Sequence, residues 1–339
     1  MPREHRVRDI AVQAGLSETT VDRVLNGRAG VSPRARRQVE QAIQDLDRQA
    51  SQIRLDGRTL LVDLVMQAPR RFTEVVRAAL EATLPGLRPV LLRARFDLSE
   101  TAAASDIVGT LDKLRKRGSQ GVILKAPDEP EVIEAVDRLA DAGIPVVTLV
   151  TDLPTSRRVA YIGIDNRAAG ATAAYLLGQW LGAEPGSALV TLSRGSFRGE
   201  EEREMGFRST LRRLSPGRQV VELAETDGLD TTIHSQTLAA LTADPTINAV
   251  YSIGGGNRAI VQAFADLDRT CRCFIAHDLD ADNVDLLRAG ALSVVLHHDL
   301  PTDLHRACQH LLHAHGLLPD VRPAASNLHP VTPFNLPSR

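Results

Sequence analysis

The sequence predicts an α/β protein in which a three-helix N-terminal head precedes a larger body of two doubly wound parallel sheets. Residues 1–47 contain three short amphipathic helical patterns and no strand-like run. Residues 59–339 instead alternate β-branched runs with longer amphipathic stretches. Repeated β-α alternation is typical of parallel sheets covered by helices on both faces. The 339 residues are also enough for two or three compact units.

Charge is distributed unevenly between these two parts. Residues 1–58 hold 11 Arg and no Lys against 8 Asp plus Glu, a balance of +3, while the remainder holds 29 basic and 34 acidic residues, a balance of −5. The two balances sum to the net charge of −2. A modestly basic head on an acidic body is compatible with phosphate contact by the head alone.

Several classes of protein are disfavoured by what the sequence lacks. Cys271, Cys273 and Cys308 are too few for a disulfide framework, and one residue between the first two is not the spacing of a zinc knuckle. The first residues lead into no apolar segment of a signal peptide, and no run reaches 18 apolar residues. We therefore expect a cytoplasmic protein with no bound metal, no cofactor and no membrane partner.

The head carries start and stop signals for three helices. Apolar residues at i, i+3, i+4 and i+7 predict a helix over 7–14, and Gly15 ends it because glycine tolerates a positive φ. Ser17 can cap a second helix over 18–25, which Asn26-Gly27 stops. Ser32-Pro33 opens a third helix, whose inner face is Ala35, Val39, Ala42, Ile43 and Leu46.

Three short helices with a glycine-containing turn between the first two are typical of the helix-turn-helix arrangement. In that arrangement the second helix places its N-terminal residues against base edges in the major groove. Here those residues are Glu18, Thr19 and, one turn later, Arg23. From the pattern alone, a plain three-helix bundle without a DNA role stays open.

The run from Val7 to Gly27, followed by Val31-Ser32-Pro33, closely resembles the head of the LacI/GalR (lactose-repressor) family. The family pattern is an alanine-glycine-x-serine turn followed by threonine-valine-serine-arginine-valine-leucine-asparagine. This sequence departs from it at Asp22, where the family usually has serine. The resemblance implies DNA contacts from Ser17, Glu18, Thr19, Thr20, Asp22, Arg23 and Asn26.

Residues 48–58 form a polar link between the head, residues 1–47, and the body, residues 59–339. The resemblance implies a hinge helix here that inserts a leucine into the minor groove, and such wedges bend the duplex. Leu55 is the candidate wedge, although the stretch is about two residues shorter than the usual hinge and lacks its alanine-x-x-leucine pattern. An ordered, intercalating hinge and a flexible linker both stay open.

The body contains ten strand-like runs, which is more than one strongly twisted sheet carries comfortably. We therefore expect two hinged sheets of five or so strands. The runs are residues 59–65, 89–95, 121–125, 145–150, 160–164, 188–192, 220–223, 249–253, 273–276 and 292–296. The expected first lobe covers about 59–164 plus 293–322, and the second about 165–292 plus 323–339.

Ligands in such folds bind beyond the carboxyl ends of the strands. The residues just past the expected strand ends are rich in groups that donate or accept two hydrogen bonds and poor in aromatic rings, which suits a polyhydroxylated molecule. From these positions we expect effector contacts from Phe72, Asp97, Asp152, Arg203, Asn257, Asp278 and His298.

The family resemblance continues through the body. Residues 161–166 with Ala169-Gly170 are similar to the family's first lobe crossing, and residues 202–207 are similar to its arginine-x-x-glycine-aromatic segment. The resemblance implies that the arginine of that segment, Arg203, contacts effector, and that Asn257 and Asp278 make later contacts. The body thus resembles the periplasmic sugar-binding-protein fold.

A glycine run and a group of histidines are two further features, and neither predicts a phosphate-binding or metal site. Gly254-Gly255-Gly256 lacks the Lys-Ser/Thr of a phosphate-binding loop, so a tight backbone approach to ligand is the favoured interpretation. The histidines at 297, 298, 305, 310, 313 and 315 lack the helical pairing of zinc sites, so a solvated helix face is favoured.

The favoured function is a ligand-responsive DNA-binding transcription regulator and not an enzyme, and we expect it to repress a carbohydrate uptake or catabolism operon. A solute-binding protein and a sugar-acting α/β enzyme with an appended head are the alternatives. Its expected partners are a pseudo-palindromic double-stranded operator, a small sugar or polyol and a second copy of the chain. The segment from Ala324 has three prolines and no heptad, so a homodimer is expected rather than a coiled-coil tetramer.

Overall fold

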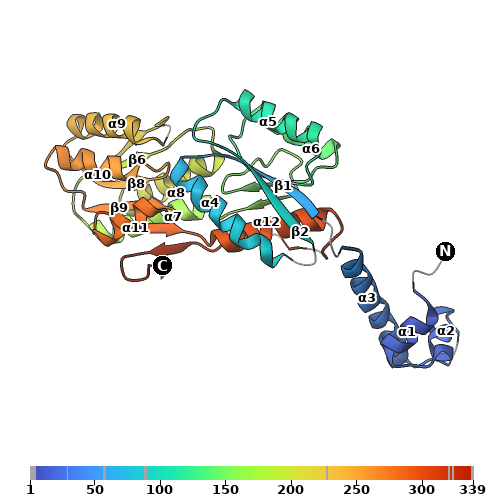
Figure 1. Ribbon diagram of the computed structural model, residues 1–339. Coiled ribbons are helices and arrows are strands. Elements are labelled where there is room, and N and C mark those ends of the chain that lie inside the picture. Colours follow the sequence, from blue (N-terminus) through green and yellow to red (C-terminus); the bar gives the residue numbers. More distant parts are fainter. Residues whose placement is uncertain are drawn as a thin grey trace. The chain divides into compact units, whose positions relative to one another are not determined.

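The structure is a computed structural model that describes residues 5–28, 30–55, 59–87, 90–226, 228–319, 321–322 and 324–336, with side chains described outside 48–55. It divides into two compact units, residues 1–60 with 88–91 and residues 61–87 with 92–339. The first unit contains the head and the second contains both sheets of the body (Figure 1).

The head is built from α1 (Val7–Ala14), α2 (Glu18–Leu25) and α3 (Pro33–Leu55). Its core consists of one buried face from each helix, namely Ile10, Ala11, Val21, Val39 and Ala42. Gly15 ends α1 with φ 64°, a left-handed conformation that glycine adopts without steric cost. Ser17 caps α2 by accepting a hydrogen bond from the Thr20 amide at 3.2 Å. The helix boundaries expected in the head at 7–14 and 18–25 are confirmed.

The third helix extends further than the sequence pattern suggests. Its apolar face ends near Leu46, yet the backbone stays helical to Leu55. The stretch 48–55 is therefore helical in the structure rather than an irregular linker. Residues 56–58 lie outside the described part of the chain, as does the Leu55 side chain.

The first sheet has the strand order β2-β1-β3-β4-β5. The strands are β1 (Thr59–Gln67), β2 (Leu91–Ser99), β3 (Val122–Lys125), β4 (Val146–Leu149) and β5 (Ala160–Ile162). α5 (Ala104–Arg117) and α6 (Pro130–Asp141) cover one face, where they pack on Val65, Val122, Leu124 and Val146. α4 (Arg70–Thr83) and α12 (Leu300–Ala314) pack against each other, and α12 also contacts β4 and β5 (Figure 1). The short helix η1 (Leu84–Gly86) follows α4.

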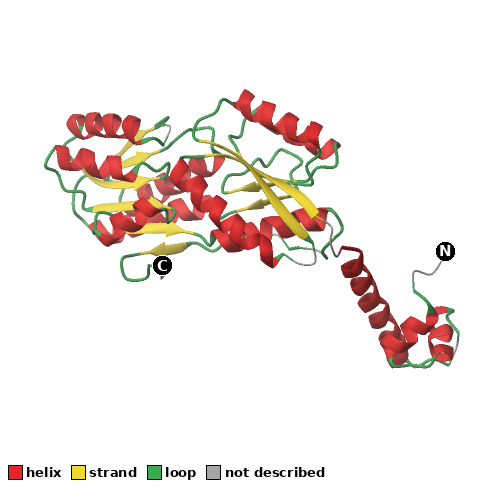
Figure 2. Cartoon of the chain, viewed as in Figure 1, coloured by secondary structure: helices red, strands yellow, loops and turns green. Residues whose placement is uncertain are grey.

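The second sheet has the strand order β11-β10-β9-β8-β6-β7, in which only β11 is antiparallel to its neighbour. The strands are β6 (Ser187–Thr191), β7 (Val220–Leu223), β8 (Ile247–Ser252), β9 (Cys273–His277), β10 (Val294–His297) and β11 (His329–Val331). One face packs on α7 (Asn166–Leu181) and α8 (Arg198–Leu214). The other packs on α9 (Asp230–Ala243), α10 (Asn257–Asp266) and α11 (Ala281–Arg288). Figure 2 shows helices on both sides of the strands.

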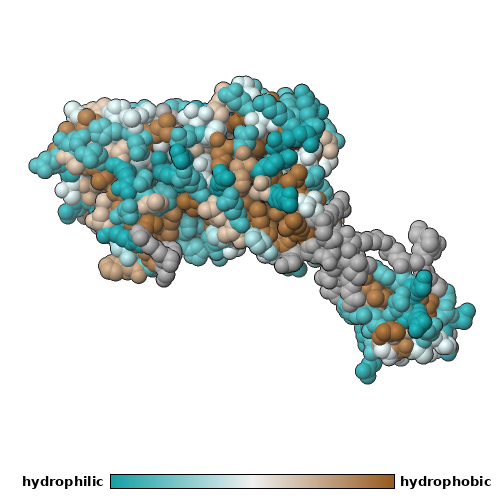
Figure 3. Space-filling view, viewed as in Figure 1, coloured by the Kyte–Doolittle hydropathy of each residue, from teal (hydrophilic) through white to brown (hydrophobic). Residues whose placement is uncertain are grey.

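Each of the ten expected strand runs overlaps a strand, so the doubly wound two-sheet fold class is confirmed. The short strand β11 was not expected, because its sequence His329-Pro330-Val331 has no β-branched run. On the face seen in Figure 3, hydrophilic side chains cover α5 and α6, as the amphipathic patterns require. Within the described residues, no helix is both long and apolar enough to cross a membrane.

The expected lobe division is wrong for β10. Residues 293–322 are expected in the first lobe, but Val294–Leu296 pair in parallel with β9 of the second sheet. The chain thus returns to the first sheet only after His297, entering α12. A buried apolar strand fits either sheet equally well, so periodicity cannot choose between them. The remaining lobe boundaries stay predictions.

Candidate functional site

The exposed surface of α2 brings the expected base-contacting residues together. Ser17, Glu18 and Thr19 are exposed at its N-terminal end, and Arg23 is exposed one turn further on. The Ser17 and Thr20 hydroxyls are 2.8 Å apart, so both also contribute to the cap. The surface can therefore present polar side chains to a groove without disturbing the helix core.

Asp22, the departure from the family pattern, is held by its own helix end. The Asn26 side-chain amide donates to the Asp22 carboxylate at 2.7 Å and to its backbone carbonyl at 2.9 Å. The Arg28 guanidinium lies 3.7 Å from the same carboxylate. Asp22 and Asn26 thus stabilise the C-terminus of α2 in the unbound head.

The body contains a pocket at the carboxyl ends of strands from both sheets. It encloses about 790 Å³ of empty space, part of which is open solvent. Its lining comes from loops or helix starts that follow β1, β2, β3, β4, β6, β8 and β9. The residues are Gln67, Ala68, Pro69, Arg71, Phe72, Glu100, Lys125, Val150, Thr151, Ser193, Arg194, Phe197, Gly199, Glu200, Arg203, Ile253, Gly254, Gly255, His277, Asp278, Asp280 and Asn283.

Two lining residues adopt strained backbone conformations. Val150 has φ 67° and Asp278 has φ 64°, values that non-glycine residues rarely adopt. Such conformations cost on the order of 1–3 kcal/mol each and cluster at binding sites. The Val150 carbonyl accepts from the Tyr161 hydroxyl at 3.2 Å, and the Asp278 amide donates to Leu296 at 3.1 Å. These bonds hold the strained segments at the pocket wall.

Arg203 projects into the pocket from α8. Its Nε donates to the Asn166 side chain at 2.8 Å, while its Nη2 is buried without a hydrogen-bond partner in the described part of the chain. α7 and α8 approach each other closely at this point. A Cβ on Gly170 would lie 1.8 Å from the Arg203 carbonyl oxygen, and a Cβ on Gly206 would lie 2.1 Å from that of Arg167. Two glycines therefore allow the close packing that positions Arg203.

Asp278 is supported by a buried histidine. His298 Nε2 lies 3.5 Å from Asp278 Oδ1, and His298 Nδ1 lies 2.5 Å from Asp303 Oδ2. Burial alone would lower the pKa of His298, but the bonds and charges of the two carboxylates outweigh it and raise that pKa to about 9. Burial acts to raise the pKa of Asp278, yet His298 and Arg203 hold it well below its usual range. Asp278 is thus a carboxylate that accepts hydrogen bonds.

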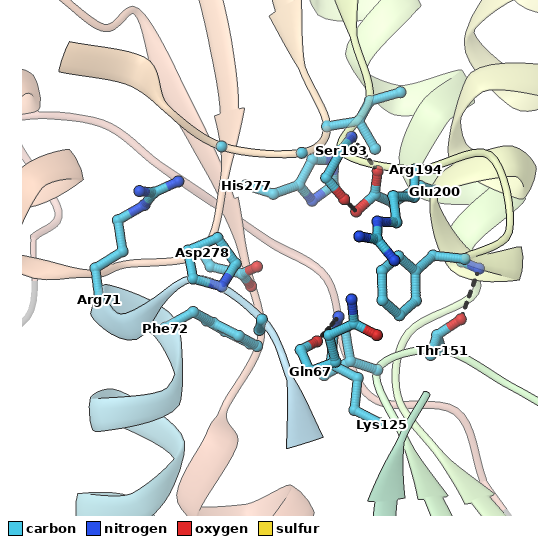
Figure 4. A pocket seen from close by; sticks show the side chains of 18 of the residues that line it. Gln67, Arg71, Phe72, Lys125, Thr151, Ser193, Arg194, Glu200, His277 and Asp278 are labelled. Atoms are coloured by element: carbon cyan, nitrogen blue, oxygen red, sulfur yellow. Dashed lines mark hydrogen bonds between the residues drawn. The ribbon is translucent and has the colours of Figure 1, made fainter. Parts of the chain in front are cut away.

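Lys125 ends β3 and points toward Gln67 in Figure 4. Its ammonium donates to the Gln67 carbonyl at 2.9 Å and lies 4.0 Å from the centroid of the Phe197 ring. Burial lowers its pKa to about 8. Nearby, Glu200 accepts from the Ser193 amide at 2.7 Å and from the Ser193 hydroxyl at 2.5 Å.

Contacts across the pocket join the two lobes. Arg71 of α4 donates to the Gly228 carbonyl at 2.8 Å and lies 3.5 Å from Asp280. Arg194 donates to the Ala102 carbonyl at 3.0 Å. The Asp128 amide donates to the Ser196 carbonyl at 2.8 Å. These are contacts of lobes closed over the pocket.

The structure brings three of the seven expected effector residues to the pocket wall, namely Phe72, Arg203 and Asp278. Two others lie directly behind it. His298 supports Asp278, and Asn257 donates to Asn283 at 2.6 Å, which in turn donates to the carbonyls of His277 and Asp278. His298 and Asn257 thus contact residues of the pocket lining instead of lining the pocket themselves.

Asp97 and Asp152 do not line the pocket. Asp97 is exposed within β2, before the strand ends. Asp152 faces away, where it accepts from Arg158 at 2.6 Å and from Thr148 at 2.7 Å. Its neighbour Thr151 lines the pocket instead. Both were chosen from their distance past a strand, which does not determine the direction of the side chain.

Sequence reasoning missed several polar lining residues, including Arg71, Ser193, Glu200, His277 and Asp280. One signal was present for Glu200, because it precedes Arg203 by three residues and so shares its helix face. Gly254 and Gly255 also line the pocket. A Cβ on Gly255 would lie 2.5 Å from Arg71 Nη2, so the glycine run admits the Arg71 side chain. No group of three or more metal-ligating side chains gathers within the described residues.

Comparison with known proteins agrees with this architecture. Residues 73–315 match the family model of the periplasmic binding protein domain. Residues 6–49 match that of bacterial regulatory proteins of the lacI family.

Curated relatives include the HTH-type transcriptional regulator reg1 of Streptomyces lividans, 34% identical over 173 residues. Another is the HTH-type transcriptional regulator MalR of Streptomyces coelicolor, 31% identical over 172 residues. Each match covers 48% of this chain and 47% of the relative, so the chain spans about half the length of the curated relatives it matches.

Solved structures share the fold of the body. A glucose-galactose binding protein from Geobacillus stearothermophilus has a TM-score of 0.73 at 22% identity, covering 83% of this chain and 99% of its own. A solute-binding protein from Burkholderia graminis in complex with D-arabinose has a TM-score of 0.74 at 21% identity, covering 83% and 97%.

Proposed function

The chain belongs to the periplasmic binding protein domain family and carries the DNA-binding domain of lacI-family bacterial regulatory proteins, and from this premise we propose that it is an effector-responsive transcription regulator. Its head binds operator DNA, and a small polyhydroxylated effector binds between the lobes of its body. Curated relatives named as transcriptional regulators, rather than as enzymes, support this function.

The observation that carries the proposal is a buried donor and a buried acceptor in one pocket, neither of which forms a hydrogen bond within the described residues, although the acceptor also lies 3.5 Å from His298 Nε2. Arg203 Nη2 and Asp278 Oδ1 form no hydrogen bond among the described residues. Buried polar groups in native proteins are nearly always paired, and an unmade bond costs about 1–3 kcal/mol. Sugar hydroxyls both donate and accept, so one such ligand satisfies both atoms. Phe72 and Phe197, also in the lining, offer apolar faces to the ring carbons.

The regulator acts in the cytoplasm as a repressor of a carbohydrate uptake or catabolism operon, and it binds a pseudo-palindromic site as a homodimer. Effector contacts from both lobes bias the balance between open and closed bodies, because a ligand shifts a conformational balance only by binding the two states differently. The resulting change in the spacing of two heads alters operator affinity. Coupling of this kind typically amounts to about 1–3 kcal/mol and is reciprocal.

The test selects a binding site from random duplex DNA with the full chain and then titrates that site with and without sugars, polyols and nucleosides. Effectors are first found by thermal shift, because a ligand at 100 times its Kd stabilises the native state by about 2.7 kcal/mol. We expect a selected site with two-fold symmetry and a compound that both stabilises the chain and changes operator affinity. A chain that selects no site, or whose stabilising ligands leave operator affinity unchanged, contradicts the proposal.

A further inference from the structure

We propose that the effector is a hydroxylated anion, a sugar acid or a sugar phosphate, whose acidic group is bound by Lys125 and Arg203. The inference rests on the proposed function and narrows the effector class of the same pocket. It starts from two buried cations that form no ion pair at 4.0 Å or less within the described residues.

Lys125 is the first of these cations. The chain has three lysines, and Lys113 and Lys116 are exposed on α5 whereas Lys125 is 8% exposed. Its ammonium has three donors, of which one reaches the Gln67 carbonyl. The Phe197 ring below it attracts the charge but neutralises none of it. A buried cation in this setting is costly unless an anion pairs with it.

Arg203 is the second cation. It is 3% exposed, and Nε is its bonded donor, held by the neutral Asn166 amide. A guanidinium has five N–H donors in a planar fork that matches carboxylate and phosphate geometry. Its unpartnered Nη2 therefore leaves part of that fork available to a ligand.

The carboxylates of the pocket are engaged elsewhere. Glu200 accepts hydrogen bonds from the Ser193 amide and hydroxyl, and Asp278 lies beside His298. Asp280 accepts from the Asn283 amide at 2.8 Å, and Glu100 accepts from the Arg70 amide at 2.9 Å. Within the described residues, none forms an ion pair with Lys125 or Arg203 at 4.0 Å or less. A ligand carboxylate or phosphate supplies two or three acceptor oxygens and a negative charge in direct contact with the cations, whereas a neutral hydroxyl supplies only an acceptor.

The same pocket retains a site for hydroxyl groups. Asp278 accepts hydrogen bonds and stays ionised beside His298, so it favours a hydroxyl donor and repels a second acidic group. In Figure 4 Asp278 and Phe72 lie on one side of the pocket, and Lys125 with Gln67 lies on another. The expected ligand therefore directs its acidic group toward Lys125 and its hydroxyls toward Asp278.

The test compares matched compounds on the full chain. Glucose is measured against glucuronate, gluconate and glucose 6-phosphate, and galactose against galacturonate and galactose 6-phosphate, by thermal shift and then by calorimetry. We expect at least one acidic compound to bind about tenfold or more tightly than its neutral parent. Comparing the sugar acids with the sugar phosphates shows whether the acidic group of the effector is a carboxylate or a phosphate.

Variants assign that preference to the pocket. Lys125→Met and Lys125→Gln should each reduce the ratio of acidic to neutral affinity about tenfold, while Lys116→Met on exposed α5 should keep the wild-type ratio. Affinities are compared below the lowest Tm of the set, and Lys125→Gln serves if Lys125→Met does not fold.

Neutral parents that bind as tightly as the acidic compounds, or a ratio that survives both Lys125 variants, would overturn the inference and leave the proposed function standing. If no compound of either kind stabilises the chain, the inference fails together with the sugar-like effector class, and operator selection still tests the DNA-binding part separately.

Discussion

Each charged residue around the pocket has a particular set of partners. His298 is held between Asp278 and Asp303, Arg203 is held by Asn166, and Lys125 has a carbonyl and an aromatic ring beside it. Arg203 and Lys125 are thus buried charged residues with few hydrogen bonds to the rest of the protein. Their consequences can be measured one residue at a time.

Arg203→Ala should abolish the effect of the ligand on operator affinity and leave affinity without ligand nearly intact. The substitution removes a charged hydrogen-bond partner, whose loss costs about 1.5–3 kcal/mol of ligand binding. Operator binding with and without effector measures both quantities. Arg212→Ala, an exposed position on the same helix, is the control. A mutant that responds at the wild-type effector concentration would show that Arg203 is structural.

Arg23→Ala should cost about 1–3 kcal/mol at one base pair, as the loss of a bidentate guanine contact does. Arg23 is exposed one turn into α2, where a recognition helix reads the groove. The measurement is binding to the selected operator and to its point variants. Uniform weakening across all variants would instead reassign Arg23 to phosphate contact.

The pH dependence of stability should report the burial of Lys125. Burial lowers its pKa from 10.5 to about 8, Glu200 and Asp278 oppose this shift, and Arg203 adds to it. Between about pH 8 and the unshifted pKa of 10.5, Lys125 binds more protons in the unfolded chain than in the folded one. The free energy of unfolding should therefore rise with pH in this window. Urea unfolding across this window should show a smaller rise for Lys125→Met than for wild type or Lys116→Met. Equal slopes would contradict the shift.

At the scale of helices and strands, close backbone contact between α7 and α8 positions the pocket. Gly170 and Gly206 lie where any Cβ would overlap the backbone of the facing helix. The same α7 carries Gly178, whose added Cβ would lie 3.6 Å from Ser215 Oγ, an ordinary contact. One helix therefore holds a glycine that packing requires and another that packing does not.

Gly170→Ala should lower the free energy of unfolding by about 1–3 kcal/mol or more, because overpacking forces the helices apart. It should also weaken effector binding, since the Arg203 backbone is the atom group displaced. Gly178→Ala should be neutral or stabilising, because alanine is about 1 kcal/mol more favourable than glycine inside a helix. Denaturant unfolding and effector titration test both. If Gly170→Ala and Gly178→Ala lowered stability and effector binding equally, the close contact of α7 with α8 at Gly170 would not be the cause.

At the scale of the whole molecule, the body is two sheets joined by chain crossings after β5, after β10 and before β11. Residues Ile164 and Ser326 of two of these crossings form a parallel bridge. Cross-pocket contacts of Arg71 and Arg194 add to this connection. We therefore expect any change in closure of the body to occur at these crossings, while each sheet keeps its own core.

We expect the full chain to be a homodimer. One helix-turn-helix head reads a short half-site, so specific binding needs two heads on a pseudo-palindrome. Light scattering at micromolar concentration measures the mass directly, and the chain mass of 36.7 kDa makes one, two and four copies easy to separate. A monomer or a tetramer would contradict the expectation.

The sequence by itself determined the local structure of both units. The helices of the head begin and end at residues with a local conformational or capping preference, namely Gly15, Ser17 and Asn26-Gly27. The ten strand runs follow from β-branched burial in parallel sheets. The family resemblance also predicted that Arg203 lies at the pocket wall, and it does. The arginine-x-x-glycine-aromatic pattern that carries this prediction lies within five consecutive residues.

Only the tertiary structure decided which side chains meet in the pocket. Arg71 enters it whereas its neighbour Arg70 pairs with Glu74 on the outside, because the rotation of α4 on the sheet selects the inward face. Asp97 and Asp152 are excluded for the same kind of reason, and β10 joins the second sheet by pairing with β9. A local pattern determines that a strand or helix forms. Its neighbour and its rotation depend on packing against residues far away in the sequence, which no local pattern contains.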